Sequence, residues 1–161
     1  MKVTTSKGDR DAIIDKCEEI IIGGEPITCP LTHRFTDGMY SREIFMAKGT
    51  VLTSRVHKTN HPFVVSKGKC KVFDGHSIME IEAPYTGITE SNTRRLLYIE
   101  EDTIWTTFHV TDLKDIKEIE EEILVNYKNE LLDQDQFFAF NNECTKENII
   151  VENIKKIKGG K

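Results

Sequence analysis

The spacing of hydrophobic positions divides the chain into three parts. Residues 9–22 place apolar side chains at helical intervals, which predicts a short amphipathic helix that Asp9 caps and that Gly23 and Gly24 end. Between Tyr40 and His109, short β-rich runs alternate with turn signals, a pattern typical of all-β sandwiches and barrels. The predicted strands are 40–46, 50–57, 63–68, 69–73, 77–83, 86–88, 94–99 and 103–110.

The helical period returns after Thr111. Residues 112–132 carry apolar positions three to four apart, with Asp112 as the cap and Asp115 adding negative charge to the first turn. The remaining tail is apolar without a clear period, and we expect it to pack on the barrel or to form oligomer contacts. The chain therefore divides into an N-terminal helix and loop (1–39), a β-barrel (40–111) and a C-terminal helix and tail (112–161).

Composition narrows the class of protein. The 161 residues are 38% hydrophobic and 30% charged, which is enough to bury a core. No apolar run reaches the roughly 18–20 residues that a membrane span needs, and the N-terminus is polar, so we expect a cytoplasmic protein without membrane contacts. The net charge of −5 argues against binding of a nucleic acid polymer. The four cysteines include no CxxC pair, which predicts free thiols.

Arginine is distributed unevenly along the chain. All six arginines precede residue 112, whereas the segment after it has lysine only. Arginine grips planar anions such as carboxylate and phosphate better than lysine does. An anion site is therefore expected in the first two thirds of the chain.

One motif in the β-rich region has regular intervals. Gly49 is followed by five residues, then Arg55, His57 two further on, three residues, His61, six residues and Gly68. These intervals resemble the first motif of the cupin superfamily, in which two histidines and a glutamate stand where this chain has Arg55, His57 and His61. The resemblance implies an all-β cupin-like (jelly-roll) barrel, here with an N-terminal helix and a C-terminal helical extension.

The second cupin motif has a weaker counterpart. It overlays on residues 90–95, with Glu90 for its proline, Asn92 for its glycine and Arg95 for its histidine. The segment 29–111 also resembles small cupin-like proteins encoded by bacteriophages. That resemblance implies the host cytoplasm as the setting, and the cupin resemblance together with the apolar tail suggests a homodimer.

The histidines support two kinds of site. A divalent transition metal usually takes three or more protein ligands, so His57 and His61 need a third from His109, Glu101, Asp102 or His33. Positive charge at Arg55 and Arg95 opposes a bound cation. The metal ligands that we predict are His57, His61 and His109, and absence of any cofactor is the alternative.

The second kind of site is a pocket for a small anionic ligand. Arg55 and Arg95 would clamp the anion, and histidines would donate or accept hydrogen bonds. An aromatic side chain would stack on a planar ring, as in a nucleotide. The predicted ligand-binding residues are Arg55, His57, His61, Arg95, Tyr98, Trp105 and His109, with Tyr85 as a further stacking candidate.

Strand periodicity adds an orientation to this site. Val51, Thr53, Arg55 and His57 share one face of the run 50–57, and we expect that face to point into the barrel. On the run 103–110, the interior is lined either by the face of Trp105 and His109 or by the opposite face.

Three functions remain open at this point. The first is a non-catalytic pocket for an anionic metabolite or nucleotide, such as a phage protein that sequesters a nucleotide signal of host defence. The second is a metal-dependent cupin enzyme, an isomerase, epimerase or dioxygenase acting on a sugar or small acid. The third is a virion-associated protein whose barrel serves only as a scaffold.

Overall fold

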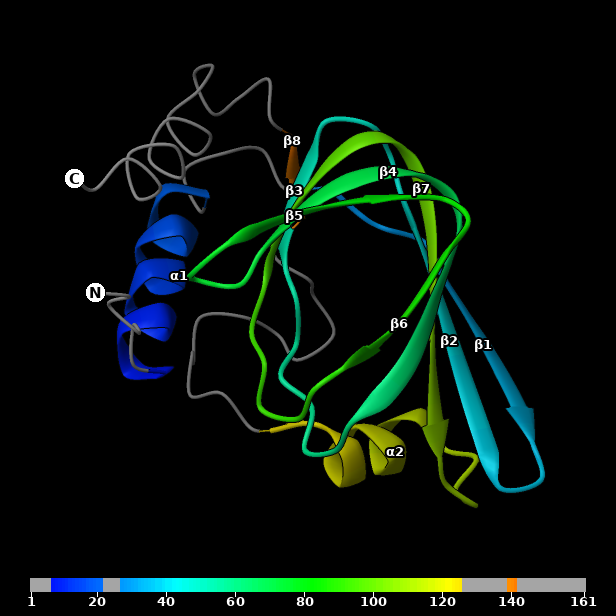
Figure 1. Cartoon of the computed structure of the whole chain (residues 1–161). Coiled ribbons are helices and arrows are strands. Elements are labelled where there is room, and N and C mark those ends of the chain that lie inside the picture. Colours follow the sequence, from blue (N-terminus) through cyan, green and yellow to red (C-terminus); the bar gives the residue numbers. More distant parts are fainter. Residues whose placement is uncertain (1–6, 22–26, 126–138, 142–161) are drawn as a thin grey trace.

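Two long antiparallel strands organise the molecule. The computed structural model describes residues 7–21, 27–125 and 139–141, which form an eight-stranded barrel-shaped sheet and two helices (Figure 1). Helix α1 (Lys7–Ile21) lies beside the barrel, and helix α2 (Ile116–Ile123) lies across its lower end in this view. The strands are β1 (Leu31–Thr36), β2 (Met39–Met46), β3 (Thr50–Thr53), β4 (His61–Phe73), β5 (Ile78–Glu82), β6 (Tyr85–Thr89), β7 (Leu96–Val110) and β8 (Ala139–Asn141).

Strands β4 and β7 pair with each other, and four of the other strands pair directly with one of these two. β5 and β6 pair with the other edge of β4, while β2 and β3 pair with the other edge of β7. β1 extends the sheet beyond β2, and β8 extends it beyond β3. The sheet therefore takes strands from both sides of the predicted barrel boundaries at residues 40 and 111, because β1 precedes the first and β8 follows the second.

Each long strand corresponds to two predicted strands. The run 63–73 contains a Ser-Lys-Gly-Lys sequence that predicts a turn, yet β4 passes through it with shifts of register against β7. Gly68 has φ of +93°, and a Cβ built there would lie 2.3 Å from the backbone oxygen of Asp102. The glycine thus permits a bulge where the two backbones approach closely, and the strand bends instead of ending.

Alternation along these strands fills the barrel. Inward side chains of β2, β4 and β7 form one apolar core that includes Ile44, Phe63, Val65 and Trp105. The rings of Phe63 and Trp105 stack with their centroids 4.4 Å apart. The Trp105 and His109 face of β7 is therefore the one that lines the interior.

The expected orientation of the run 50–57 is wrong for its strand. Leu52 joins the barrel core, whereas Val51 packs with Cys17 of α1 on the outer face. β3 ends at Thr53, and Ser54 turns to exchange hydrogen bonds with the backbone of Arg95. The irregular backbone at 54–56 breaks the two-residue period, so the strand pattern does not extend to His57.

A buried charge joins helix α1 to the barrel. Arg94 is 6% exposed and forms ion pairs with Asp15 and Glu18 of α1. Cys17 and Ile13 of the same helix pack on Val51, Phe73 and Leu96. Helix α1 therefore seals the outer face of the sheet with both apolar and ionic contacts.

The second helix is shorter than the sequence predicts. Asp115 caps it by accepting hydrogen bonds from the backbone nitrogens of Lys117 and Glu118, and the helix ends at Ile123. Leu124 is extended and forms a β-bridge with His57, so the period through residue 132 does not extend the helix there. Residues 126–138 lie outside the described part, as do Cys144 and most of the predicted tail.

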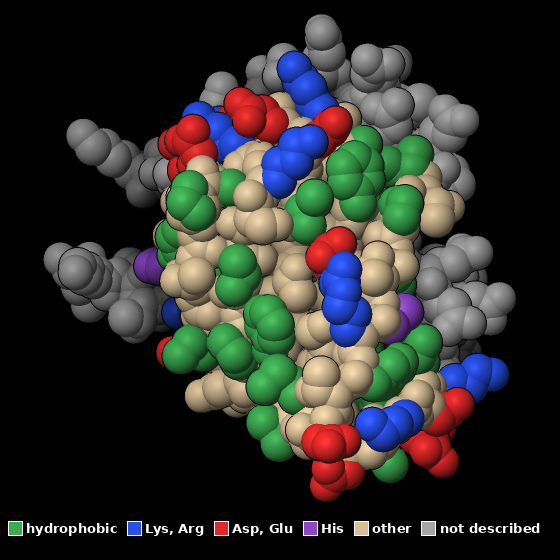
Figure 2. Space-filling view, turned by 90° about the vertical axis from the view of Figure 1, so that its right-hand side faces the viewer, with side chains coloured by type: hydrophobic (Ala, Val, Ile, Leu, Met, Phe, Trp, Pro, Cys, Tyr) green, Lys and Arg blue, Asp and Glu red, His purple; other side chains and the backbone are tan. Residues whose placement is uncertain are grey.

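The surface carries both apolar and charged side chains (Figure 2). In the described ranges, neither helix combines the length and apolar character that crossing a membrane requires. Figure 2 shows hydrophobic side chains spread over one face, with charged side chains mainly near its upper and lower edges. The large hydrophobic side chains that are exposed are Phe35, Met39, Met79, Ile88, Val110 and Leu113.

Gly68 provides a test of the bulge. We expect Gly68→Ala to lower the free energy of unfolding by about 3 kcal/mol or more, because the new methyl group meets the backbone of β7. Gly38→Ala is the matched control: Gly38 also has positive φ, but its nearest neighbour would be 3.9 Å away, so the loss is about 1–2 kcal/mol. Urea denaturation measures both, and equal losses would contradict the close approach.

Candidate functional site

Three buried histidines meet at the end of the barrel that α2 covers. His57 comes from the segment after β3, His61 begins β4, and His109 lies near the end of β7. Their ring centroids are 4.2 Å apart for His57 and His61, 5.1 Å for His57 and His109, and 4.7 Å for His61 and His109. One nitrogen from each ring lies within 4.8 Å of the other two, so one small ion could contact all three.

The strand register explains two of these positions. Phe63 of β4 is opposite Thr107 of β7, so His61 and His109, each two residues further along, face inward at the same level. His57 is held by its backbone instead. Its carbonyl accepts a hydrogen bond from the Asn92 amide at 2.8 Å, while its bridge to Leu124 fixes the other side.

The outer nitrogens of two rings are occupied. His61 Nδ1 lies 3.3 Å from the carbonyl oxygen of Thr59, and His109 Nε2 lies 3.0 Å from Thr107 Oγ1. By contrast, Nδ1 of His57 and Nδ1 of His109 are buried without a hydrogen-bond partner in the described structure. Buried ring nitrogens rarely stay unsatisfied, so this cluster has the donor atoms for a further group.

Electrostatics keeps the imidazoles neutral. Burial, and then the neighbouring His61 and His109, lowers the pKa of His57 to about 2. Burial, followed by His61, lowers the pKa of His109 to about 3. The pKa of His61 is lowered as well, first by burial and further by the charge of Arg95, against the hydrogen bond with the Thr59 backbone. Neutral imidazole is the form that coordinates a metal ion.

Arg42 is the site residue that the sequence analysis missed. It lies on β2 opposite Thr107, and its charge contributes to the lowered pKa values of both His57 and His109. Tyr40, its neighbour on the same face of β2, is opposite His109 and stacks on that ring at 5.9 Å between centroids. The alternation of Tyr40, Arg42 and Ile44 in the sequence was the available signal, because it places the arginine on the face of two large buried side chains.

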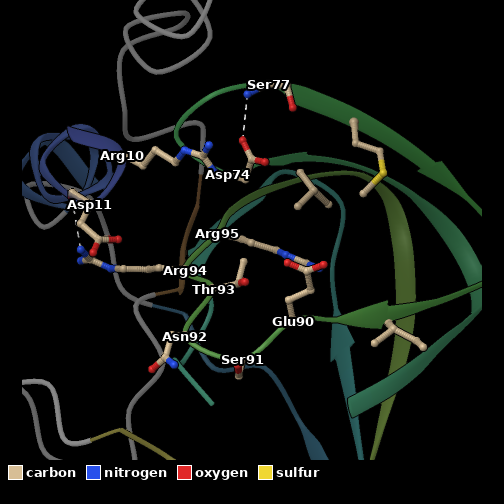
Figure 3. Close-up of a pocket in the computed structure, with 13 residues that line it drawn as sticks. Arg10, Asp11, Asp74, Ser77, Glu90, Ser91, Asn92, Thr93, Arg94 and Arg95 are labelled. Carbon is tan, nitrogen blue, oxygen red and sulfur yellow. Dashed lines mark hydrogen bonds between the residues drawn. The ribbon is translucent and has the colours of Figure 1, made fainter. Parts of the chain in front are cut away.

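The other predicted ligand-binding residues do not join this cluster. Arg55 forms an ion pair with Glu120 of α2 at 2.8 Å. Trp105 lies in the apolar core against Phe63, and Tyr98 packs on the outer face near α1. Arg95 lines a separate cavity together with Arg94 and Asp74 (Figure 3).

The alternative metal ligands also lie elsewhere. His33 Nδ1 is 2.6 Å from the hydroxyl oxygen of Tyr40, so Tyr40 separates it from the cluster. Glu101 is exposed, and Asp102 accepts a hydrogen bond from the Lys48 amide. Among the described residues, His57, His61 and His109 are the set that fits one ion.

Comparisons with known proteins give only distant structural similarities. No protein-family model and no curated protein matches the sequence. A cupin-2 domain protein from Shewanella frigidimarina covers 60% of this chain and 92% of its own length at 7% identity, with a TM-score of 0.43. An RmlC-like cupin with a double-stranded β-helix fold from Methanocaldococcus jannaschii covers 53% and 82% at 9% identity, with a TM-score of 0.44.

A third solved structure has the same character. A cupin superfamily protein from Desulfitobacterium hafniense covers 55% of this chain and 82% of its own at 7% identity, with a TM-score of 0.45. All three descriptions name cupin proteins, whereas the all-β barrel of this chain and its N-terminal and C-terminal helices are read from its own strands and helices. At this similarity no activity or ligand transfers to this chain.

The lowered pKa values predict how acid affects the metal-free protein. An unfolded histidine binds a proton near pH 6.5, whereas folded His57 and His109 stay neutral down to about 2 and 3, so between these limits the unfolded state holds more protons. The free energy of unfolding should therefore fall as the pH is lowered below 6.5, by up to about 1.4 kcal/mol per pH unit for each histidine. Denaturation of chelator-treated protein from pH 7.5 to 4.5 measures the slope, which His109→Gln should reduce; an unchanged slope in that variant would contradict the lowered pKa.

Proposed function

We propose that the protein is a metal-dependent enzyme of cupin-like fold, in which His57, His61 and His109 bind one divalent transition metal ion. The observation that carries the proposal is the buried cluster of three neutral imidazoles with two unsatisfied nitrogens. A bound cation would give those nitrogens the partner that they lack. Imidazole donors suit zinc, copper, iron and nickel, and the ion would act as a Lewis acid or redox centre.

The number of ligands favours catalysis over a purely structural role. Structural zinc sites are usually closed by four protein ligands, whereas catalytic sites combine three with a position for water or substrate. Within the described residues, the cluster holds three donors and no fourth histidine, cysteine or carboxylate completes it. A hydrogen bond that His61 Nδ1 donates to the Thr59 carbonyl, and one between His109 Nε2 and the Thr107 hydroxyl, would fix the orientation of two of the rings.

Charge near the cluster favours a small anionic substrate. Arg42 adds positive charge beside His57 and His109, and an anion between it and a metal ion would offset the repulsion of the two cations. The objection that Arg55 would repel a metal ion loses force, since Arg55 is paired with Glu120. Helix α2 supports the same end of the barrel, where Ile119 and Ile123 pack on Tyr40 and keep water from that side of the site.

The structure does not bring together the two arginines on which the predicted anion-binding pocket depends. Arg55 and Arg95 were expected to clamp one ligand, but Arg55 contacts α2 and is not among the described residues that line the cavity of Arg95. A nucleotide of host defence therefore lacks the two-arginine clamp on which that prediction rested. The phage setting, the homodimer, the cytoplasmic location and the virion-associated scaffold stay predictions.

Metal analysis tests the proposed centre. We expect protein purified without chelators to contain about one transition metal ion per chain by elemental analysis. After chelation, adding zinc or cobalt at a hundred times its dissociation constant should raise the free energy of unfolding by about 2.7 kcal/mol. His57→Ala and His109→Ala should weaken metal binding at least about a hundredfold, because each removes a direct ligand.

His76→Ala is the matched control, since it removes a histidine that lies outside the cluster. It should bind metal as the natural chain does. Retention of stoichiometric metal by His57→Ala, or absence of any metal effect on the natural chain, would contradict the proposed centre. If metal binds but small carboxylates and phosphates leave the spectrum of the cobalt form unchanged, the anionic substrate is wrong while the metal site stands.

A further inference from the structure

A second cavity is lined by residues of α1 and of the barrel, and none of the three histidines is among them. Its volume is about 530 Å³, which is in the range of small-molecule sites. Figure 3 shows α1 on one side, the turn between β4 and β5 above, and the turn between β6 and β7 below. The lining residues are Arg10, Asp11, Val72, Asp74, Ser77, Met79, Ile88, Glu90, Ser91, Asn92, Thr93, Arg94 and Arg95.

Of the three arginines that line the cavity, Arg94 forms ion pairs within the protein, whereas Arg10 and Arg95 could bind a ligand anion. Arg94 is compensated by its ion pairs with Asp15 and Glu18. Arg95 forms no ion pair within the described residues, and its guanidinium carbon lies 5.8 Å from the centre of the Phe63 ring. The cavity therefore offers Arg95 as a donor to a ligand carboxylate.

Arg10 adds a donor from the side of the helix. Its Nε is buried without a hydrogen-bond partner in the described structure. Its backbone and Cβ lie against Gly75, where an added Cβ would be only 2.6 Å from that of Arg10, so the helix is fitted closely to the turn. A buried guanidinium nitrogen without a partner is costly, and a ligand oxygen would satisfy it.

Carboxylates on the opposite side exclude a simple anion. Asp74 Oδ1 accepts hydrogen bonds from the amides of His76 and Ser77, both at 2.8 Å, which fixes the carboxylate at the edge of the cavity. Glu90 is the first residue after β6, and it lines the cavity. Figure 3 shows the side chains of Glu90 and Arg95 extending toward each other. With Asp11 also present, a polyanion such as a nucleotide would meet three like charges.

Apolar side chains complete the lining. Ile88 is 65% exposed and Met79 is 40% exposed, and both border the cavity. Val72, which is buried, lies beneath them in the apolar core. Exposed apolar side chains beside charges of both signs suit a molecule that carries both kinds of group.

We propose that this cavity binds a small zwitterion with an apolar portion, of the class of the apolar α-amino acids. The ligand carboxylate contacts Arg10 and Arg95, its ammonium group lies near Asp74 and Glu90, and its side chain covers Met79 and Ile88. The proposal does not depend on the metal centre, because none of the three histidines lines this cavity.

Calorimetric titration of the full-length protein tests the ligand class. The probes are leucine, methionine and phenylalanine, with phenethylamine and 3-phenylpropionate as analogues of phenylalanine that lack one charge. We expect at least one of the amino acids to bind. If phenylalanine is a ligand, both analogues should bind at least tenfold more weakly than it does. If phenylalanine is not a ligand, neither analogue should bind. Binding of 3-phenylpropionate as tight as any amino acid would overturn the zwitterion, and so would a lack of binding by all three amino acids.

Variants locate the binding site. Arg95→Gln and Glu90→Gln should each weaken binding of the best amino acid at least tenfold, and Glu90 is exposed, so its variant should fold normally. Arg34→Gln is the matched control, because Arg34 is an exposed arginine paired with Glu43 on another part of the sheet. His57→Ala should lose metal but keep the amino acid. Unchanged binding in both cavity variants would overturn the assignment of the site.

Discussion

The pairing of β4 with β7 is the constraint on which the structure depends. Each strand gives one edge to the other and uses its second edge for two shorter strands, so their register fixes the position of the entire sheet. The same register places His61 level with His109. A slip of β4 by one residue would turn His61 and Phe63 out of the barrel, and a slip of β7 would do the same to His109 and Trp105. The apolar core and the polar cluster therefore depend on the same hydrogen bonds.

The barrel interior changes character along this pair of strands. Trp105 and Phe63 stack in the apolar part, and further along the strands, two residues from Phe63 and four from Trp105, the buried side chains are His61 and His109. Burial of several imidazoles is unfavourable unless they are neutral and have partners, and the lowered pKa values meet the first condition. The unsatisfied nitrogens leave the second open, which is why the cluster points to function more strongly than to stability.

Local pattern was sufficient for part of this architecture. The glycine-to-glycine intervals and the β-rich runs predicted the all-β barrel, and the apolar periods predicted helices at both ends. The continuity of β4 and β7 was not predictable from pattern, because the turn signal around Gly68 is satisfied by a bulge within a pair of strands.

The site residues were harder to predict than the fold. Arg42 was missed because its neighbours Ser41 and Glu43 give the run a polar character, and only the alternation with Tyr40 and Ile44 places it inward. The ion pair of Arg55 was not predictable from local pattern, because its partner, Glu120, is 65 residues away in sequence.

The ion pairs that attach helix α1 to the barrel involve a buried arginine, Arg94. Mobile salt ions weaken charge pairs that water reaches, such as Arg34 with Glu43, but they have little access to a guanidinium that is 6% exposed. Since α1 also forms one wall of the second cavity, the shape of that cavity is tied to a contact that the surrounding electrolyte hardly reaches. A change of ionic strength should therefore weaken the pair of Arg94 with buried Glu18 less than it weakens the pair of Arg34 with Glu43.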